Sequence, residues 1–187
     1  ARFAVHGLAQ LASEPGGGKT RRVLEQAALR ALGKATDSDV QAFLLRQLQL
    51  VGSDRCVPVV TPHLKDDCLC EPAAQALVAV KAPADLKATS FLGALAGAPT
   101  ARQITLVRAL GVLAEPASTQ AILPFASADD ATLRRVARYA LANAGAAPVA
   151  EVLQKDLSSE NVKDAGQTIR HLLLLAKRLG ENGDSDA

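Results

Sequence analysis

Apolar residues recur along the chain at the spacing of one helix face, in four segments that align with one another. The anchors of these segments are Leu48, Leu77, Leu110 and Leu141, which follow one another at intervals of 29, 33 and 31 residues. Apolar residues also stand four positions before and three positions after each anchor: Leu44 and Val51, Ala73 and Val80, Leu106 and Leu113, Ala137 and Ala144. Offsets of −4, 0 and +3 lie on one stripe of an α-helix. The pattern predicts four similar amphipathic helices.

The position immediately before each anchor is mostly small. It holds Gln47, Ala76, Ala109 and Ala140. A recurring Ala at one point of a packed stripe indicates that a neighbouring helix approaches too closely for a larger side chain. We therefore expect these helices to pack against one another through small residues.

A breaker and a second helix follow each predicted first helix. The residue four positions after the anchor is Gly52, Lys81, Ala114 or Gly145, and Gly favours the left-handed conformation that ends a helix. Asp54, Pro83, Pro116 and Pro148 then fit the first turn of the next helix. Ser38 and Gln41 have the spacing of a capping box, and Asp66–Asp67 and Asp129–Asp130 precede helices that their charges would favour. The repeat anchored on Leu77 departs from the pattern, with Lys81 at the breaker position and Thr89 in a core slot.

Helical hairpins of about thirty residues that share small contacts are typical of α-solenoids. Residues 48–54, 110–116 and 134–141 (LQLVGSD, LGVLAEP and RRVARYAL) resemble HEAT repeats, in particular the short type found in phycobilisome lyase subunits. The resemblance covers about residues 38–157. It implies an all-α, right-handed superhelix of about five helical hairpins plus a C-terminal helix. Such repeats serve many unrelated functions, so the resemblance concerns the fold.

The flanks extend this array less regularly. Residues 1–12 and 20–32 predict a further hairpin, with Thr20 as the cap of its second helix. A long helix capped by Ser158 or Ser159 is predicted to run to Leu179 and to end at Gly180. We expect one domain over residues 1–180 and a disordered tail over 181–187. The chain contains no Met, and we expect it to be a piece of a longer protein.

Composition and charge narrow the function classes. The chain holds 21 Lys and Arg against 19 Asp and Glu, a formal net charge of +2, which predicts little non-specific affinity for nucleic acid or anionic membranes. No run of eighteen apolar residues occurs, so membrane insertion is not expected.

With no Trp and a single Tyr, the chain is poorly equipped for the base-handling pocket of the HEAT-like DNA glycosylases, which share only the architecture. Nucleic-acid binding by an arginine ridge remains an alternative; the ridge would comprise Arg46, Arg102, Arg108, Arg134, Arg135 and Arg138.

Two motifs suggest chemistry that their context does not support. The stretch Gly16–Thr20 looks like a phosphate-binding loop, but Ser13 stands where that motif needs Gly and no strand precedes it. Cys56, His63, Cys68 and Cys70 lie within fifteen residues and could form a tetrahedral zinc site. Only one residue separates Cys68 from Cys70, and Cys56 occupies a core slot, so we interpret the cysteines as packing residues, at least one of them exposed. No cofactor is expected.

We find no convincing set of catalytic residues, since His6, His63 and His171 fall on different predicted helices. We therefore expect a non-enzymatic scaffold that binds a protein or peptide. Bilin attachment or isomerisation, which the resemblance to phycobilisome lyases implies, is the enzymatic alternative. The expected binding face is formed by the second helices, with the candidates Thr61, His63, Lys65, Lys87, Ser90, Ser118, Gln120, Glu151, Gln154 and Lys155. Four consecutive leucines, residues 172–175, exceed one packed face, so Leu174 or Leu175 is expected to contact another subunit or domain.

Overall fold

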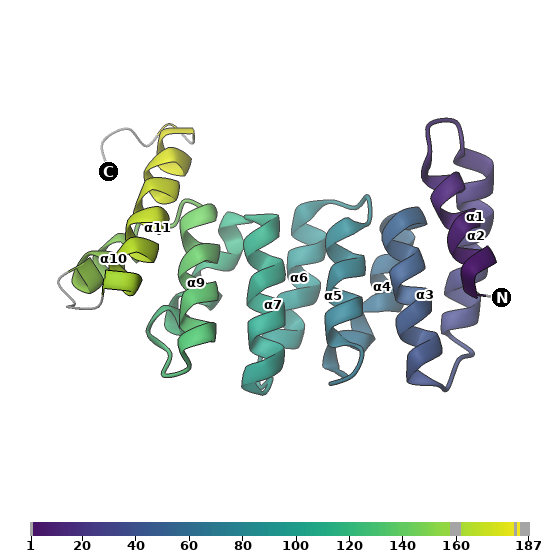
Figure 1. Cartoon of the computed structure of the whole chain (residues 1–187), viewed down its shortest axis with the longest axis horizontal. Coiled ribbons are helices and arrows are strands. Elements are labelled where there is room, and N and C mark those ends of the chain that lie inside the picture. The colour runs from purple at the N-terminus through teal and green to yellow at the C-terminus, as the bar shows by residue number, and fades with distance from the viewer. Residues whose placement is uncertain (1, 158–161, 182, 184–187) are drawn as a thin grey trace. The chain divides into compact units, whose positions relative to one another are not determined.

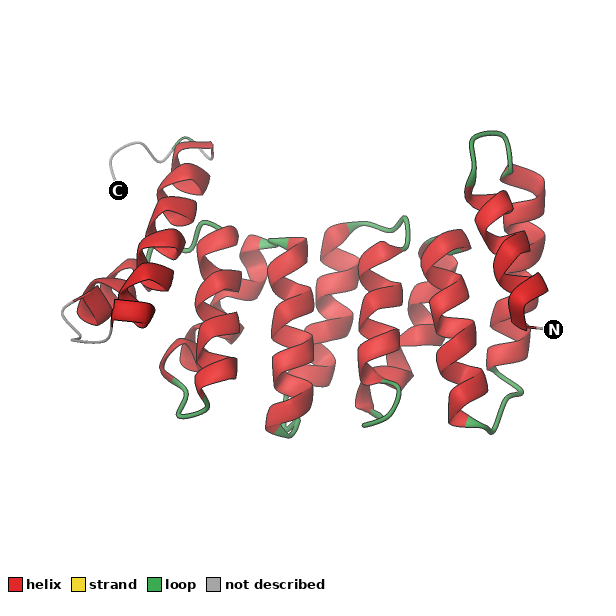
Figure 2. Ribbon diagram, in the orientation of Figure 1, coloured by secondary structure: helices red, strands yellow, loops and turns green. Residues whose placement is uncertain are grey.

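The computed structural model describes residues 2–157, 162–181 and 183. Figure 2 shows that they form helices joined by short loops, and none of the described residues belongs to a strand. The predicted all-α class is therefore confirmed. No helix in the described ranges is both long and apolar enough to cross a membrane. The chain divides into two compact units, Ala1–Ala94 and Leu95–Ala187.

The first unit consists of helices that pack in chain order (Figure 1). α2 packs against α1 and α3, and α3 packs against α5. A segment of three short helical pieces, η1, α4 and η2, connects α3 to α5. The bounds are α1 Arg2–Ser13, α2 Gly18–Leu32, α3 Ser38–Val51, η1 Asp54–Cys56, α4 Val57–Val60, η2 Thr61–Lys65, α5 Cys70–Ala79 and α6 Ala84–Leu95, whose last residue falls in the second unit.

In the second unit, too, helices pack against others that are near them in the sequence. α7 packs against α9, α9 packs against α11, and α10 packs against α11 (Figure 1). A segment of short pieces again connects two longer helices, here α7 and α9. The bounds are α7 Thr100–Leu113, η3 Pro116–Ser118, α8 Thr119–Ile122, η4 Leu123–Ser127, α9 Ala131–Asn143, α10 Val149–Leu157 and α11 Val162–Glu181.

The repeating stripe predicted from the sequence is the core. All four anchors, Leu48, Leu77, Leu110 and Leu141, are at most 1% exposed. The flanking stripe positions are buried as well, except Leu113, which is half-buried. Burying a Leu side chain contributes about 1.5–3 kcal/mol. The same three positions, at −4, 0 and +3 from the anchor, therefore stabilise each of four successive first helices.

Small residues mark close helix contacts, as predicted. Ala76, Ala109 and Ala140 are buried, and a Cβ added to Gly111 of α7 would lie 2.8 Å from the Ala140 Cβ of α9. Gln47 takes the same position in α3 without breaking the pattern, because its side chain has polar partners there. It pairs with His6 of α1 at 3.0 Å and donates to the Phe43 carbonyl at 3.1 Å.

The helix ends differ from the sequence-based expectation in several places. Asp37, not Ser38, caps α3 by accepting a hydrogen bond from the Val40 N–H. α2 begins at Gly18, so Thr20 is not its cap. Thr89 is exposed rather than in the core. Asp130 does cap α9, through the Leu133 N–H.

The breaker positions also behave differently from one another. Gly52 has an ordinary φ of −69°, and it is required by crowding, since a Cβ there would lie 2.5 Å from the Leu48 carbonyl oxygen. The left-handed conformation is instead taken by Ala114, with φ 51°, and by Gly145.

Two of the predicted second helices are not continuous. Residues 54–65 and 116–127 each alternate between α and 3₁₀ turns. Pro58, Pro62 and Pro124 lie inside these segments, where proline cannot donate the helical hydrogen bond. At the C-terminus, α11 continues beyond Gly180 to Glu181, which pairs with Arg178 at 2.8 Å. Ser158, Ser159 and most of the predicted tail, residues 182 and 184–187, lie outside the described residues.

Candidate binding surface and an arginine-lined cavity

The second-helix candidates are mostly accessible. Lys65, Gln120, Glu151, Gln154 and Lys155 are exposed, and Thr61, His63 and Ser90 are half-buried. Thr61 and Ser90, from η2 and α6, lie together, with their hydroxyl oxygens 3.0 Å apart. Burial lowers the pKa of His63, and the nearby Asp66 opposes this effect. The structure thus brings together one pair of the expected residues and leaves most of the others at the surface.

Two residues expected on this surface are instead buried. Lys87 is 8% exposed, and its ammonium donates to the carbonyls of Val78 at 3.1 Å and Val80 at 3.4 Å. Those carbonyls end α5, where a positive charge is favourable. Burial lowers the pKa of Lys87. Ser118 is 1% exposed, and within the described part of the chain its hydroxyl oxygen has no hydrogen-bond partner.

The run of four leucines is oriented differently from the expectation. Leu175 is 3% exposed and belongs to the core of the second unit, and Leu174 is half-buried. Leu173, at 67%, is the exposed member. Helical geometry explains this result. Residues 175 and 179 lie on the face that packs, and residue 173 lies about 160° around the helix from residue 175.

The cysteines occupy three different environments. Cys56 is fully buried and its thiol donates to the Glu25 carboxylate at 3.2 Å, while Cys70 is buried and Cys68 exposed. Burial, followed by the hydrogen bond to Glu25, raises the pKa of Cys56 to about 12. Cys56 is therefore a core thiol, as predicted, and Cys68 is the expected exposed one. The described residues do not group three His, Cys, Asp or Glu side chains as metal ligands.

Glu25 and Arg21 form a polar clamp that the sequence analysis missed. Both lie on one face of α2. The Glu25 carboxylate, on a residue 2% exposed, accepts hydrogen bonds from the Ser53 N–H at 2.7 Å and the Ser53 hydroxyl at 2.5 Å. Arg21 donates to the Val51 and Gly52 carbonyls at 3.0 and 3.3 Å. The clamp fixes the turn after α3. Their i, i+4 spacing was the only sequence signal, and it did not reveal the partners.

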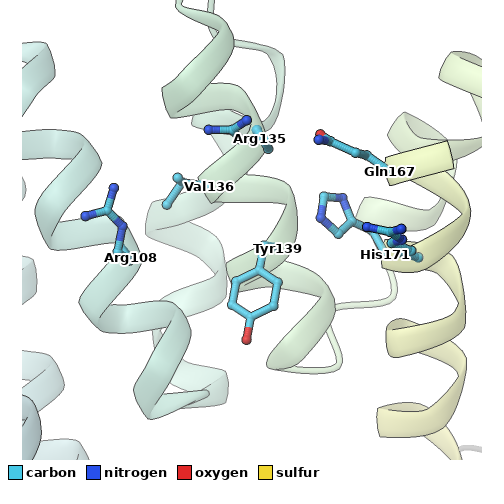
Figure 3. A pocket seen from close by; sticks show the side chains of 7 residues that line it. Arg108, Arg135, Val136, Tyr139, Gln167 and His171 are labelled. Carbon is cyan, nitrogen blue, oxygen red and sulfur yellow. The ribbon is translucent and has the colours of Figure 1, made fainter. Parts of the chain in front are cut away.

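A cavity of about 380 Å³ lies in the second unit between α7, α9 and α11 (Figure 3). Its lining is rich in hydrogen-bond donors and carries three guanidinium groups. The lining residues are Arg108, Arg135, Val136, Tyr139, Gln167, Arg170 and His171. Figure 3 shows Gln167 and His171 extending from α11 towards α9, which carries Arg135 and Tyr139. Among the side chains that the structure describes, which do not include those of residues 156 and 162–164, the lining contains no carboxylate.

Only two of the six arginines singled out from the sequence, Arg108 and Arg135, line this cavity. Arg134 donates to the carbonyls of Ala128 and Asp129, and Arg138 donates to the Ala126 carbonyl, so both stabilise the turn before α9. The cavity residues of α11 were missed. Their spacing of three and four residues from Gln167 was the available signal, but the sequence did not show which helix they face.

Polar contacts hold the three helices around the cavity. The Asn143 amide of α9 donates to the Gly111 carbonyl of α7 at 2.8 Å. The Asn143 amide oxygen accepts from Arg178 of α11, at 2.8 Å from Nη2 and 3.1 Å from Nε. The rings of Tyr139 and His171 pack with centroids 6.3 Å apart. Burial, followed by the charge of Arg138, lowers the pKa of His171.

Comparisons with known proteins support the helical fold and do not bear on the function. No protein family matches the chain, and no curated protein matches it. One of the solved structures that match is the crystal structure of an engineered protein from the Northeast Structural Genomics Consortium. It has 21% sequence identity and a TM-score of 0.55 over 93% of this chain. This chain covers 54% of that protein, about half of its length.

Proposed function

We propose that this chain is a HEAT-like α-solenoid module that binds a protein or peptide partner without catalysing a reaction. The observation that carries the proposal is the repeated packing of the first helices. The same buried stripe recurs in α3, α5, α7 and α9, with small residues such as Ala140 at the contacts. Repeats that bury the same positions against their neighbours are typical of solenoids, whose extended surfaces bind other macromolecules.

The proposed partner surface is formed by the second segments of the hairpins. In the first unit these segments offer Lys65 from η2, and in the second unit they offer Gln120 from α8 and Glu151, Gln154 and Lys155 from α10, all exposed. Mixed charges and amides of this kind suit a polar protein surface, since a polyanion would favour a uniformly basic one. Lys87 takes no part in this surface, because its ammonium donates a hydrogen bond to the Val78 carbonyl of α5.

The test compares charge reversals in the second segments with a charge reversal in a first helix. Lys65→Glu and Lys155→Glu alter the proposed surface, and Arg46→Glu, at an exposed position of the first helix α3, is the matched control. Partners captured by cross-linking would be purified and titrated with each variant by calorimetry. We expect the two second-segment variants to weaken binding by roughly tenfold or more, and the control to leave it unchanged.

Two results would argue against the proposal. One is a partner that binds all three variants equally well, which would place its site elsewhere. The other is the absence of any protein that binds saturably. Leu173→Glu, examined by sedimentation, separates self-association from partner binding, since Leu173 is the exposed member of the leucine run.

A further inference from the structure

We propose that the cavity between α7, α9 and α11 binds a phosphate monoester group. The site lies on first helices and on α11, so it is separate from the second-segment surface proposed above and does not depend on it. The group would be carried by a small phosphate ester or by a phosphorylated side chain, which present the same chemistry to the cavity.

The charge of the lining is the first argument. Three guanidinium groups, from Arg108, Arg135 and Arg170, line a space of about 380 Å³, and no carboxylate lines it among the side chains that the structure describes, which do not include those of residues 156 and 162–164. Within the part of the chain that the structure describes, Arg135 and Arg170 form no hydrogen bond or ion pair with protein groups. Like charges that share a cavity repel one another, and a bound anion removes that cost.

The geometry of the donors is the second argument. A guanidinium group presents its N–H groups as a planar fork that matches two oxygens of one phosphoryl group. Gln167 adds an amide and His171 a ring nitrogen at the same cavity, and Tyr139 also lines it. A phosphate monoester carries about −1.5 to −2 charges at neutral pH, whereas a carboxylate carries one. Several arginines around one site therefore favour the monoester.

The rigidity of the frame is the third argument. Asn143 joins α7 to α11 through Gly111 and Arg178, and Tyr139 packs on His171. The donors are consequently held by three tied helices rather than by a loop, which lowers the conformational cost of binding. A space of about 380 Å³ is within the range of small-ligand sites, so it accommodates the phosphoryl group with part of its ester.

The test titrates the full chain with phenyl phosphate, a phosphoserine peptide and the same peptide with unmodified serine, by calorimetry at low ionic strength. We expect saturable 1:1 binding of at least one phosphorylated probe with a dissociation constant of about 1 mM or tighter. Arg135→Gln and Arg170→Gln should each weaken it by roughly tenfold or more, and Arg135→Lys should restore it only partly. Arg46→Gln, at an exposed arginine of α3 that does not line the cavity, is the control and should have no effect. The preferred probe distinguishes a free ester from a phosphorylated peptide.

A second readout follows the histidines by NMR. Bound phosphate should raise the pKa of His171, which lines the cavity, and leave that of His63 unchanged. The proposal is overturned if neither phosphorylated probe saturates, or if binding survives Arg135→Gln and Arg170→Gln. It is also overturned if an unphosphorylated oligonucleotide binds more tightly than both probes and loses affinity equally in Arg46→Gln, which would indicate diffuse polyanion binding.

Discussion

Gly111 of α7 lies against Ala140 of α9 so closely that a Cβ at position 111 would be 2.8 Å from the Ala140 Cβ and 3.0 Å from its Cα. Gly in a helix interior is ordinarily a weakness, because it has more conformational freedom to lose than Ala. Here the missing methyl group is what lets two helices of the second unit approach.

Replacing this glycine tests the contact directly. Gly111→Ala should lower the free energy of unfolding by about 1–3 kcal/mol, because overpacking exceeds the gain of about 1 kcal/mol in helix propensity. Gly93→Ala in α6, where a Cβ would meet nothing within 4 Å, is the matched control and should be stabilising. Urea denaturation measures both. Equal effects of the two substitutions would show that the contact is not restrictive.

A second prediction concerns the left-handed residue at the end of α7. Ala114 has φ 51°, a conformation that costs a residue with a Cβ roughly 1–2 kcal/mol. Gly removes this cost but adds about 0.5–1 kcal/mol of unfolded-state entropy, so Ala114→Gly should raise stability by about 0.5–1 kcal/mol. Ala144→Gly, at a right-handed position after α9, should lower stability instead. Thermal unfolding of the two variants gives the comparison.

The Asn143 amide should be important for holding α11. Asn143→Ala removes the donor to Gly111 and the acceptor for Arg178, and should cost about 1–2 kcal/mol. Hydrogen exchange should become faster in α11 in particular, because the link to α9 is lost. Lys177→Ala, which removes an exposed ion pair 3.7 Å long with Glu181, should change stability by less than about 0.5 kcal/mol. Uniformly faster exchange throughout the chain would argue for a general loss of stability instead.

Lys87 provides a test of a buried ammonium. Lys87→Met keeps the aliphatic stem and removes the hydrogen bonds to Val78 and Val80, so we expect a loss of about 1 kcal/mol. Lys65→Met, at an exposed position, should change stability by less than about 0.5 kcal/mol. If Lys87→Met is stabilising in denaturant titrations, the cost of burying the charge exceeds the value of its hydrogen bonds.

The thiol of Cys56 should make the chain sensitive to alkaline pH. Its pKa is about 12 in the folded chain against an ordinary value of 9.0, so the folded state holds its proton more tightly. The corresponding stability is complete below pH 9 and is lost between about pH 9 and 12, at up to about 1.4 kcal/mol per pH unit.

Cys56→Ser isolates this contribution, since serine does not titrate in that range. The free energy of unfolding of the wild-type chain should fall more steeply above pH 9 than that of the variant. Comparing slopes makes the result independent of any constant loss that the substitution causes. Parallel slopes would show that the Cys56 pKa is not raised by folding.

The sequence by itself determined where the longer helices lie and which face each first helix buries. The anchors Leu48, Leu77, Leu110 and Leu141 and the small residue Ala140 were identified from spacing alone, and all are buried. This succeeds because helix periodicity is local, so the apolar stripe of each segment is visible without its neighbours.

Tertiary structure decided which polar residues are accessible and which meet. Lys87 reaches back to the end of the preceding helix, and Glu25 reaches a turn 28 residues away at Ser53. Likewise, Arg135 of α9 and Arg170 of α11 share one cavity. Long polar side chains choose partners by distance in space rather than in sequence, and their rotamers are set by packing. Their spacing in the sequence could show which face of its own helix each side chain occupies. Only the packing of the helices shows which of those faces meet.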